Sequence, residues 1–465
     1  MPSAEDAAEA GPGTVVCVDF GSTFTKATLV DLVKARVVAA AEHRTTIDTD
    51  VLDGYDACLA SLVEQDARAA TAQVLACSSA GGGLRIAVVG NEALVTAEAG
   101  RRVALSSGGK VVAVVAASRR MPGQSLGDNL RAVLGHTIPP PDLVLLTGGT
   151  DGGNSEVIVA AAHELVAAGW RGPVVVAGNA EAAVEVAIIL AGVPHVFADN
   201  VVPQIGVLRP ASARAAIRET FLTHVIGGKH LSARDGGDTF VAMVRGATPD
   251  VVLTGVEVLA AAAGDVVVVD VGGATTDVHS VVGLDPEDAG LARDVVAPTA
   301  LTRTVEGDLG MRWSALNTVE AAQLPDLVGA ARVRTLDPSY LPSTDTDRDD
   351  DEAIARAAIG LALRRHAGRA RVVVGPGGRV TERTGTDLRE VDLVVASGGV
   401  LRHGRDGVAD RVLEGAVGAG IDGGWQLPEH PRVVVDRDYV LAAVGLLATE
   451  HPEAARRLAR TLLET

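Results

Sequence analysis

Two short segments end an apolar run with an aspartate and follow it with glycine and small hydroxyl residues. In the first segment, Val15–Val18 lead into Asp19, and Gly21, Ser22 and Thr23 come next. Glycine takes backbone conformations closed to other residues, so the segment predicts a tight hairpin whose N–H groups and hydroxyls form a nest for an anion. Asp19 would repel a phosphate in that nest unless a cation or its water shell lay between them. The segment therefore indicates a metal-bound phosphate.

The same pattern recurs past the midpoint of the chain. Val266–Val269 lead into Asp270, a Gly-Gly-Ala-Thr-Thr turn follows at residues 272–276, and Asp277 precedes a return strand. Two such carboxylates could bracket one Mg²⁺ and a triphosphate, a task that needs positioning and charge stabilisation rather than covalent chemistry. One such turn alone is common in hairpins without a ligand. It is the ordered pair, together with a third element, that favours a nucleotide site.

Two further elements have a shape that suits a nucleotide cleft. The third element, DLVVASGGVLRH at residues 392–403, is a buried strand followed by the bend Ser397-Gly398-Gly399. Glycine there lets the backbone approach a flat ligand, although an ordinary strand-to-helix turn explains the bend as well. The fourth element, DYVLAAVGLLA at residues 438–448, carries small residues on a predicted helix. They suit either a hinge between domains or ordinary core packing.

The elements that must position these residues alternate along the chain. Apolar runs bounded by Gly-rich turns are followed by Ala-rich helical patterns, an alternation typical of α/β layers. We predict helices over residues 156–168, 180–190 and 211–223. The predicted buried strands are Val15–Val18, Ile86–Val89, Val111–Val115, Leu143–Leu146, Val174–Val176, Val266–Val269, Val372–Val374 and Leu393–Val395.

The similarity of residues 15–31 to residues 266–282 predicts two similar halves that face each other. The predicted division is a disordered tail at 1–12, a first half at 13–204, a helical insertion or linker at 205–262, a second half at 263–449 and a C-terminal helix at 450–465. Residues 285–370 are expected to be an insertion within the second half. Its acidic run, Asp345–Glu352, is expected to be a solvated loop before a helix over 353–365.

Composition narrows the class of protein. Hydrophobic residues make up 47% and charged residues 22% of the 465 residues, as in a packed globular protein. A formal net charge of -18 disfavours binding to nucleic acid or to anionic membranes, since both need clustered Lys and Arg. The three cysteines have neither metal-ligand nor disulfide spacing, which fits a reducing compartment. No signal peptide or long apolar window is present, so we expect a soluble, cytoplasmic protein.

Taken in order, these segments resemble the superfamily of actin, hexokinase and the heat-shock chaperone ATPases. Residues 15–31 resemble its first phosphate loop, residues 266–282 its second, and residues 392–403 its adenosine loop. Residues 174–192 and 438–448 resemble its first and second inter-domain connections. The resemblance implies an α/β, actin-like ATPase (ribonuclease H-like) fold, with two pseudo-symmetric domains, a central nucleotide cleft and helical insertions.

The same resemblance implies that ATP and Mg²⁺ bind in the cleft. Asp19 and Asp270 would be the catalytic carboxylates and would hold the metal with its water shell. The residues expected to bind the nucleotide are Gly21, Ser22, Thr23, Lys26, Gly272, Gly273, Ala274, Thr275, Asp277, Ser397, Gly398 and Gly399.

A narrower resemblance covers nearly the whole chain. The stretches VDFGSTFTKATLVD, LLTGGTDGGNSEVI, VVAGN, VVDVGGATTDVHSV and RTVEGDLGMR are similar to those of the glutamate mutase accessory proteins of the MutL/GlmL type. Members of that family lie beside the subunits of adenosylcobalamin-dependent glutamate (methylaspartate) mutase and are thought to be ATP-dependent reactivating chaperones. The resemblance implies a weak ATPase that acts as a chaperone, has mutase subunits as partners and couples slow hydrolysis to domain closure. It leaves a homodimer open.

Two other functions stay open at this stage. A small-molecule kinase of the same superfamily would need a base near an acceptor hydroxyl, for which Asp277 or Asp151 could be offered. A non-catalytic scaffold or filament would bind nucleotide without hydrolysing it. The Gly-rich stretches 78–83 and 147–154 remain open between structural turns and binding loops, and nothing in the sequence places residues 303–312.

Overall fold

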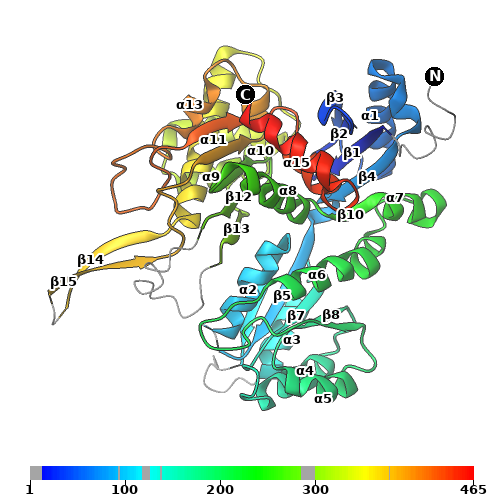
Figure 1. Ribbon diagram of the computed structural model, residues 1–465, viewed down its shortest axis with the longest axis vertical. Helices are drawn as coiled ribbons and strands as arrows, with labels where there is room; N and C mark the ends of the chain where they lie inside the picture. Colours follow the sequence, from blue (N-terminus) through cyan, green and yellow to red (C-terminus); the bar gives the residue numbers. More distant parts are fainter. Residues whose placement is uncertain are drawn as a thin grey trace.

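The structure is a computed structural model that describes residues 13–92, 95–117, 126–136, 139–283, 299–375 and 378–464. The tail expected at residues 1–12 lies outside the described residues. The described part contains three five-stranded sheets and one two-stranded ribbon. Two of the sheets lie in the upper part of Figure 1 and the third lies below them.

The first sheet has the strand order β3-β2-β1-β4-β10. Strand β2 runs antiparallel to both of its neighbours, while β1, β4 and β10 are parallel. Helix α1 (Val51–Gln65) packs on this sheet, and Asp50 caps the helix by accepting the N–H of Leu52. The strands are Thr14–Phe20 (β1), Phe24–Asp31 (β2), Arg36–Arg44 (β3), Gln73–Ser78 (β4) and Val244–Ala247 (β10).

The second sheet repeats this arrangement, with the order β13-β12-β11-β16-β17 and with β12 antiparallel to both neighbours. Its strands are Val266–Val271 (β11), Thr276–Val281 (β12), Leu301–Glu306 (β13), Leu393–Ser397 (β16) and Arg432–Val435 (β17). Each sheet thus has the order 3-2-1-4-5 with a reversed second strand, which is the ribonuclease H-like order of the actin-like ATPase fold. The predicted fold class is confirmed.

The chain leaves the first sheet after β4 and returns to it only at β10. The intervening residues, which we call the inserted domain (79–243), contain the third sheet, whose strands are all parallel in the order β6-β5-β7-β8-β9. In chain order this is 2-1-3-4-5, the flavodoxin-like doubly wound order. The strands are Leu84–Gly90 (β5), Gly109–Ala116 (β6), Leu143–Leu146 (β7), Val174–Val176 (β8) and His195–Phe197 (β9).

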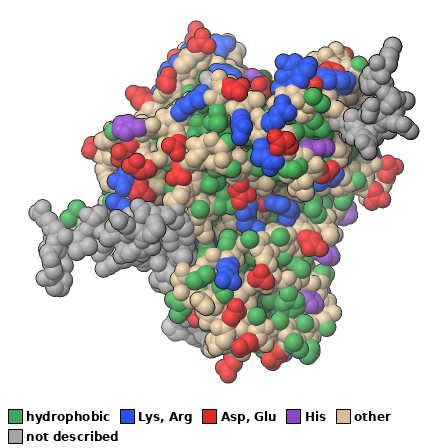
Figure 2. All heavy atoms as spheres, viewed as in Figure 1, with side chains coloured by type: hydrophobic (Ala, Val, Ile, Leu, Met, Phe, Trp, Pro, Cys, Tyr) green, Lys and Arg blue, Asp and Glu red, His purple; other side chains and the backbone are tan. Residues whose placement is uncertain are grey.

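Helices on both sides of the third sheet complete the lower part of the inserted domain. They are Thr96–Ser106 (α2), Leu126–His136 (α3), Glu156–Ala167 (α4), Ala183–Ile189 (α5) and Ala211–Thr220 (α6). A further helix, Asp238–Met243 (α7), packs instead against β4 of the first sheet. The domain forms the lower part of the molecule, and acidic and basic side chains are interspersed over the face in view (Figure 2).

The predicted boundaries of the first half, 13–204 followed by a helical insertion at 205–262, are wrong. Residues 205–262 include strand β10 of the first sheet and a long connecting helix, while the actual insertion is an α/β domain of its own. The predicted first connection at 174–192 is also wrong, because it is strand β8 and helix α5 of the inserted domain. The reason is that β10 has only four residues, VRGA, and its partner β4 lies far away in the sequence.

The two halves are joined by helices α8 (Thr248–Ala263) and α14 (Val440–Glu450), each of which follows the last strand of its sheet. The two helices touch through their backbones. A β-carbon on Gly255 would lie 2.2 Å from the carbonyl oxygen of Leu441, and one on Gly445 would lie 1.9 Å from that of Val251. The small residues predicted at 438–448 therefore serve a close helix crossing between the halves. Helix α15 (Pro452–Arg460) packs against the same pair.

A second set of elements lies between β13 and β16. It comprises Ala315–Ala321 (α9), Val328–Leu336 (α10), Asp345–His366 (α11), Arg369–Gly375 (β14) and Gly378–Thr384 (β15). Two short helices, Gly399–Arg402 (α12) and Val408–Leu413 (α13), follow β16. Among the described helices, none is both long and apolar enough to cross a membrane.

The acidic run Asp345–Glu352 is not the expected loop but the first two turns of α11. Thr344 and Asp347 form a capping box at its start. Further along, Asp351 is buried in an ion pair with Arg334, and Glu352 is paired with arginines of the segment after α12. Arginines from distant segments thus make it possible to bury charges that the sequence pattern assigned to solvent.

The helix crossing yields a first prediction. Gly445→Ala should lower the midpoint of thermal unfolding, because its methyl group must displace the main chain at Val251, at a cost of about 1–3 kcal/mol. The matched control is Gly360→Ala in α11, where the nearest atom to an added β-carbon is Arg364 Nη1 at 3.8 Å. That variant should leave the midpoint unchanged or raise it slightly, since glycine is less favourable than alanine in the interior of a helix. Equal midpoints for the two variants would contradict the tight crossing.

A second prediction concerns acid stability. The ring of His366 is buried, with Nε2 2.8 Å from Ser280 Oγ and Nδ1 3.0 Å from Thr304 Oγ1. Burial lowers the pKa of His366 to about 4, from 6.5. The unfolded chain therefore binds the proton first, and the stability present above pH 6.5 is lost as the pH falls toward 4.

As the pH falls from 7 to 4, the free energy of unfolding of the original protein decreases. We expect His366→Gln to make that decrease smaller by about 3 kcal/mol, the equivalent of the pKa shift. Denaturant unfolding at a series of pH values between 7 and 4 measures it. His430→Gln, at an exposed position, should show the same dependence of the free energy of unfolding on pH as the original protein. If His366→Gln shows that same dependence as well, the buried ring does not cause the loss of stability in acid.

Candidate functional site

The two acid-tipped turns, although distant in the chain, lie against each other. A β-carbon on Gly273 would come within 3.3 Å of Thr23 Oγ1. The carboxylates of Asp19 and Asp270 are close enough to act on each other and on Lys26. The structure therefore brings together the two turns that the sequence singles out, at the meeting of the two halves.

The first turn is closed by a hydrogen bond from the N–H of Gly21 to the carbonyl oxygen of Phe24, at 3.2 Å. A β-carbon on Gly21 would lie 2.5 Å from that oxygen, so the turn requires glycine. Thr45 holds it from behind, donating its hydroxyl to Gly21 O at 2.8 Å. Thr23 Oγ1 is buried and has no hydrogen-bond partner among the described residues. Such an atom costs about 1–3 kcal/mol unless a ligand supplies the partner.

The second turn is closed in the same way, by the N–H of Gly272 donating to the carbonyl oxygen of Thr275 at 2.9 Å. The segment after β13 braces it. Met311 donates its N–H to Gly272 O at 3.0 Å, and the hydroxyl of Ser314 donates to Ala274 O at 2.7 Å. The stretch 303–312, which the sequence left unplaced, is thus strand β13 and the support beneath the second turn.

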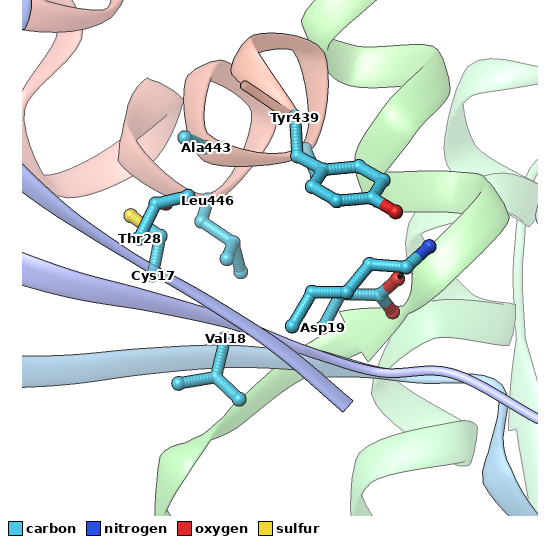
Figure 3. A pocket seen from close by; sticks show the side chains of 9 residues that line it. Cys17, Val18, Asp19, Thr28, Tyr439, Ala443 and Leu446 are labelled. Carbon is cyan, nitrogen blue, oxygen red and sulfur yellow. Dashed lines mark ion pairs between the residues drawn. The ribbon is translucent and has the colours of Figure 1, made fainter. Parts of the chain in front are cut away.

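The Asp19 carboxylate is held by side chains from helix α8 and strand β2. Thr248, the first residue of α8, donates its hydroxyl to Asp19 Oδ1 at 2.6 Å, and Lys26 Nζ lies 3.9 Å from Oδ2. The Lys26 ammonium sits 4.1 Å from the ring centroid of Tyr439, and Arg402 Cζ sits 3.5 Å from the same centroid. Asp19 on β1 and Tyr439 at the start of α14 face each other across a small cavity (Figure 3). The first turn is therefore tied to both connecting helices.

The charges of this cluster are strongly coupled. Burial disfavours the charged form of Lys26, but the Tyr439 hydroxyl, Asp19 and Asp270 outweigh it and raise the pKa of Lys26 above its ordinary value. Burial raises the pKa of Asp270, and Lys26 opposes that shift. The site thus holds a lasting positive charge beside two carboxylates, and such a charge suits phosphate oxygens.

The donor set fits magnesium and phosphate. Mg²⁺ takes one or two carboxylates and completes its shell with waters and substrate phosphates, which the pair Asp19 and Asp270 allows. In the described part of the chain no group of three or more His, Cys, Asp or Glu side chains could hold a metal by itself. The unpartnered hydroxyl of Thr23 and the ammonium of Lys26 suit phosphate oxygens.

The two turns are in contact, because a β-carbon on Gly273 would lie 3.3 Å from Thr23 Oγ1. A triphosphate between the turns therefore requires them to move apart. The small cavity beside Asp19, Lys26 and Tyr439, about 10 Å³ or room for roughly one water, lies instead between the first sheet and helix α14.

The predicted adenosine bend lies next to the second turn. Ser397 is in register with Asp270, and its hydroxyl hydrogen-bonds that carboxylate. Gly398 has a φ of 123°, and a β-carbon there would lie 2.3 Å from the carbonyl oxygen of Val271, so glycine is required. Gly399 has no heavy atom within 4 Å of an added β-carbon and faces open space, as a surface for a flat ring would.

Asp277, in contrast, is engaged elsewhere. Arg303 donates to Asp277 Oδ1 from Nη2 at 2.6 Å and from Nε at 3.1 Å. The same guanidinium is only 4% exposed and donates to the carbonyl oxygen of Leu105 in the inserted domain. Through its hydrogen bond to Leu105, Arg303 ties the second half to the inserted domain, and its ion pair occupies one oxygen of the Asp277 carboxylate.

The two Gly-rich stretches that stayed open occupy different places. Residues 147–154 follow β7 in the inserted domain, where Asp151 Oδ1 accepts from Asn200 Nδ2 at 2.9 Å. They are therefore not the counterpart of the adenosine bend in the first half. That position belongs to residues 78–83, since β4 corresponds to β16 in the order of the two sheets.

Three residues near the turns were missed from the sequence: Thr248, Arg402 and Tyr439. The sequence signal for Thr248 is its position at the start of helix α8, which directly precedes strand β11. Tyr439 is one of three tyrosines in the chain and stands directly before the small-residue helix. Arg402 lies within the predicted adenosine segment, but no local pattern shows that its side chain reaches Tyr439.

Comparison with solved structures gives only weak likenesses. Acetone carboxylase, in a nucleotide-free structure, aligns with a TM-score of 0.41 and 14% identity over 94% of this chain and 70% of that one. The ethanolamine utilization protein EutJ from Carboxydothermus hydrogenoformans gives a TM-score of 0.30 and 11% identity, over 94% and 90% of the chains. A xylulose kinase from Lactobacillus acidophilus gives 0.34 and 11%, over 97% and 92%. The fold assignment therefore rests on the strand order.

Two ribonuclease H-like halves, meeting at a pair of acid-tipped turns, define a protein with the actin-like ATPase fold. The sequence comparisons are more specific. The model of a family described as MutL protein matches residues 15–463. "Protein MutL" from Clostridium tetanomorphum is 34% identical over 467 residues, which cover 96% of this chain and 98% of that protein. The chain belongs to the MutL protein family.

The geometry of the turns gives a third prediction. Asp270→Ala should weaken the binding of ATP with Mg²⁺ at least about tenfold, because one of two metal-holding carboxylates is lost. Isothermal titration with ATP and with ADP, each with and without Mg²⁺, measures it. The matched control is Asp265→Ala at the other end of β11, where the carboxylate accepts the N–H of Gly283, far from the two turns along the strand. Unchanged affinity in Asp270→Ala would remove the metal assignment.

Proposed function

We propose that this chain binds ATP and Mg²⁺ between its two halves and acts as an ATP-dependent accessory protein of an adenosylcobalamin-dependent mutase such as glutamate (methylaspartate) mutase. One observation supports the nucleotide part above all others. The two acid-tipped turns meet beside Lys26 and beside a buried threonine hydroxyl, Thr23, that lacks a partner. Membership of the MutL protein family supports the mutase part.

In this proposal each residue has a stated task. Asp19 and Asp270 hold the metal, directly or through its waters. Lys26 and Thr23 bind phosphate oxygens, with the other residues of the two turns around them. Gly398 and Gly399 line the adenosine. Bound Mg²⁺ and ATP supply a terminal phosphoryl bond whose hydrolysis needs only positioning and charge stabilisation from the protein.

Binding requires the halves to separate, because the two turns touch at Gly273 and Thr23. The crossing of α8 and α14 suits a pivot, since no large side chain lies between the helices at Gly255 and Gly445. Closure around the nucleotide and slow hydrolysis would then change the surface that the protein presents to a mutase. Such a change is what a reactivating chaperone needs in order to release a damaged coenzyme.

A small-molecule kinase fits less well. Of the two bases considered, Asp277 is held by Arg303, and Asp151 lies in the inserted domain, bonded to Asn200. A non-catalytic scaffold would use the same cleft and differs only in the absence of hydrolysis. The proposed location is the cytoplasm, which agrees with three buried cysteines that are free thiols. The proposed partners are mutase subunits and ATP or ADP rather than nucleic acid or membrane, and a homodimer remains open.

The fourth prediction tests this function directly. Inactivated glutamate mutase, incubated with this protein, ATP, Mg²⁺ and fresh adenosylcobalamin, should recover turnover, because closure of the cleft drives exchange of the coenzyme. Asp265→Ala should support the same recovery and Asp270→Ala should not. Mutase activity and the release of ADP are followed together.

Recovery of the mutase without ATP would contradict the proposed coupling. No recovery with a properly matched mutase would contradict the reactivating role while leaving the nucleotide site intact. Light scattering that rises with ATP, without release of ADP, would instead favour a filament.

A further inference from the structure

A second cavity lies where the chain enters and leaves the inserted domain, apart from the nucleotide cleft. It measures about 310 Å³, at the small end of the range for small-molecule sites. Its walls come from the link between β4 and β5, from the start of β7 and from the segment that returns toward β10. We call it the hinge pocket, and it is lined by Gly81, Arg85, Asp142, His224, Gly228 and Lys229.

The hinge pocket carries an excess of positive charge. Arg85 Nη2 lies 2.5 Å from Asp142 Oδ1, and Lys229 Nζ lies 3.4 Å from Oδ2 of the same carboxylate. One carboxylate thus faces two cations, with the imidazole of His224 at the wall beside them. The side chain of Lys229 is only 8% exposed, so this is a built site and not a surface lysine.

The negative charge around the Lys229 ammonium does not offset the cost of burying it. Burial lowers the pKa of Lys229 and Arg85 lowers it further, while Asp142 opposes the shift without cancelling it. Apart from the carboxylate, its ammonium donates to the carbonyl oxygen of Gly81 at 3.2 Å. A bound anion would stabilise the charged form, because it would supply the counter-charge that burial makes valuable.

Glycine forms two parts of the pocket wall. Gly81 lines the pocket and has a positive φ, as do its neighbours Gly82 and Gly83, where an added β-carbon would have no heavy atom within 4 Å. The same holds for Gly228 on the opposite wall. Glycine turns of this kind let main-chain groups approach an anion without a side chain in the way.

We propose that the hinge pocket binds a phosphate group, carried by a small phosphorylated molecule or present as free phosphate, between Lys229, Arg85 and the turn at residues 81–83. A point-like ammonium beside a guanidinium and an open glycine turn is a phosphate-binding combination. The volume exceeds what a bare phosphate ion fills, which favours the phosphorylated molecule.

Occupancy of the hinge pocket has a structural consequence. Gly81 lies where the chain enters the inserted domain, Asp142 lies directly before strand β7 of its sheet, and Lys229 lies in the segment through which the chain returns toward β10. A ligand that contacts all three ties the two ends of the inserted domain to its sheet, close to the points where the domain joins β4 and β10. The site does not depend on the nucleotide cleft.

The fifth prediction is a titration of the full chain with inorganic phosphate and with glycerol 3-phosphate, using succinate as the control anion. Lys229→Gln should weaken phosphate binding at least about tenfold, because it removes a buried charge-assisted hydrogen bond. Lys34→Gln, which removes the same charge at an exposed turn, should bind as the original chain does. Tighter binding of the ester identifies a phosphorylated molecule as the ligand, and equal binding identifies free phosphate.

Hydrogen exchange gives a second test that does not alter the hinge pocket. Phosphate should protect residues 79–85 and 224–230, and it should do so equally in Asp270→Ala, whose nucleotide site is impaired. Protection confined to the turns at 20–26 and 270–276 would overturn the proposal. So would equal binding of succinate, full affinity in Lys229→Gln, or no binding of either phosphate compound at about 10 mM, a concentration well above a useful dissociation constant.

Discussion

The backbone contact between α8 and α14 decides how the two halves can face each other. Gly255 lies against the carbonyl oxygen of Leu441, and Gly445 lies against that of Val251, so each glycine contacts the residue four positions before the other. The contact is reciprocal because each helix follows the fifth strand of an equivalent sheet. No other residue fits at this distance. The crossing therefore holds the ends of β1 and β11, and with them Asp19 and Asp270, at one place.

The two acid-tipped hairpin turns could be predicted because all their features are local. A strand, an aspartate and a glycine turn lie within about ten residues, and the backbone chemistry of that pattern does not depend on the rest of the chain. The fold class follows from two such patterns in order. Strand β10 could not be predicted, since its four residues pair with β4 across the entire inserted domain. Without β10, the sequence pattern places the first connection at the apolar strand and helix of residues 174–192.

Side chains that complete the site depend on tertiary structure and were harder to predict. Thr248 reaches Asp19 only because α8 starts where β10 rejoins the first sheet. Tyr439 adopts a φ of 54°, which is unusual for a residue with a side chain, and this conformation starts α14. Asp277 stands beside a phosphate turn in sequence, yet an arginine on the next strand, Arg303, takes up its charge. The acidic start of α11 was misjudged for the same reason, because its partners are distant arginines.

The way in which the inserted domain is attached has a mechanical consequence. The chain returns from that domain as β10 and begins α8 at once, with no loop between Ala247 and Thr248. Thr248 is also the residue that holds the Asp19 carboxylate, at 2.6 Å. A force on the inserted domain is therefore transmitted along one short strand to the carboxylate itself. A partner that binds the inserted domain and shifts it could therefore displace the Asp19 carboxylate without touching the cleft.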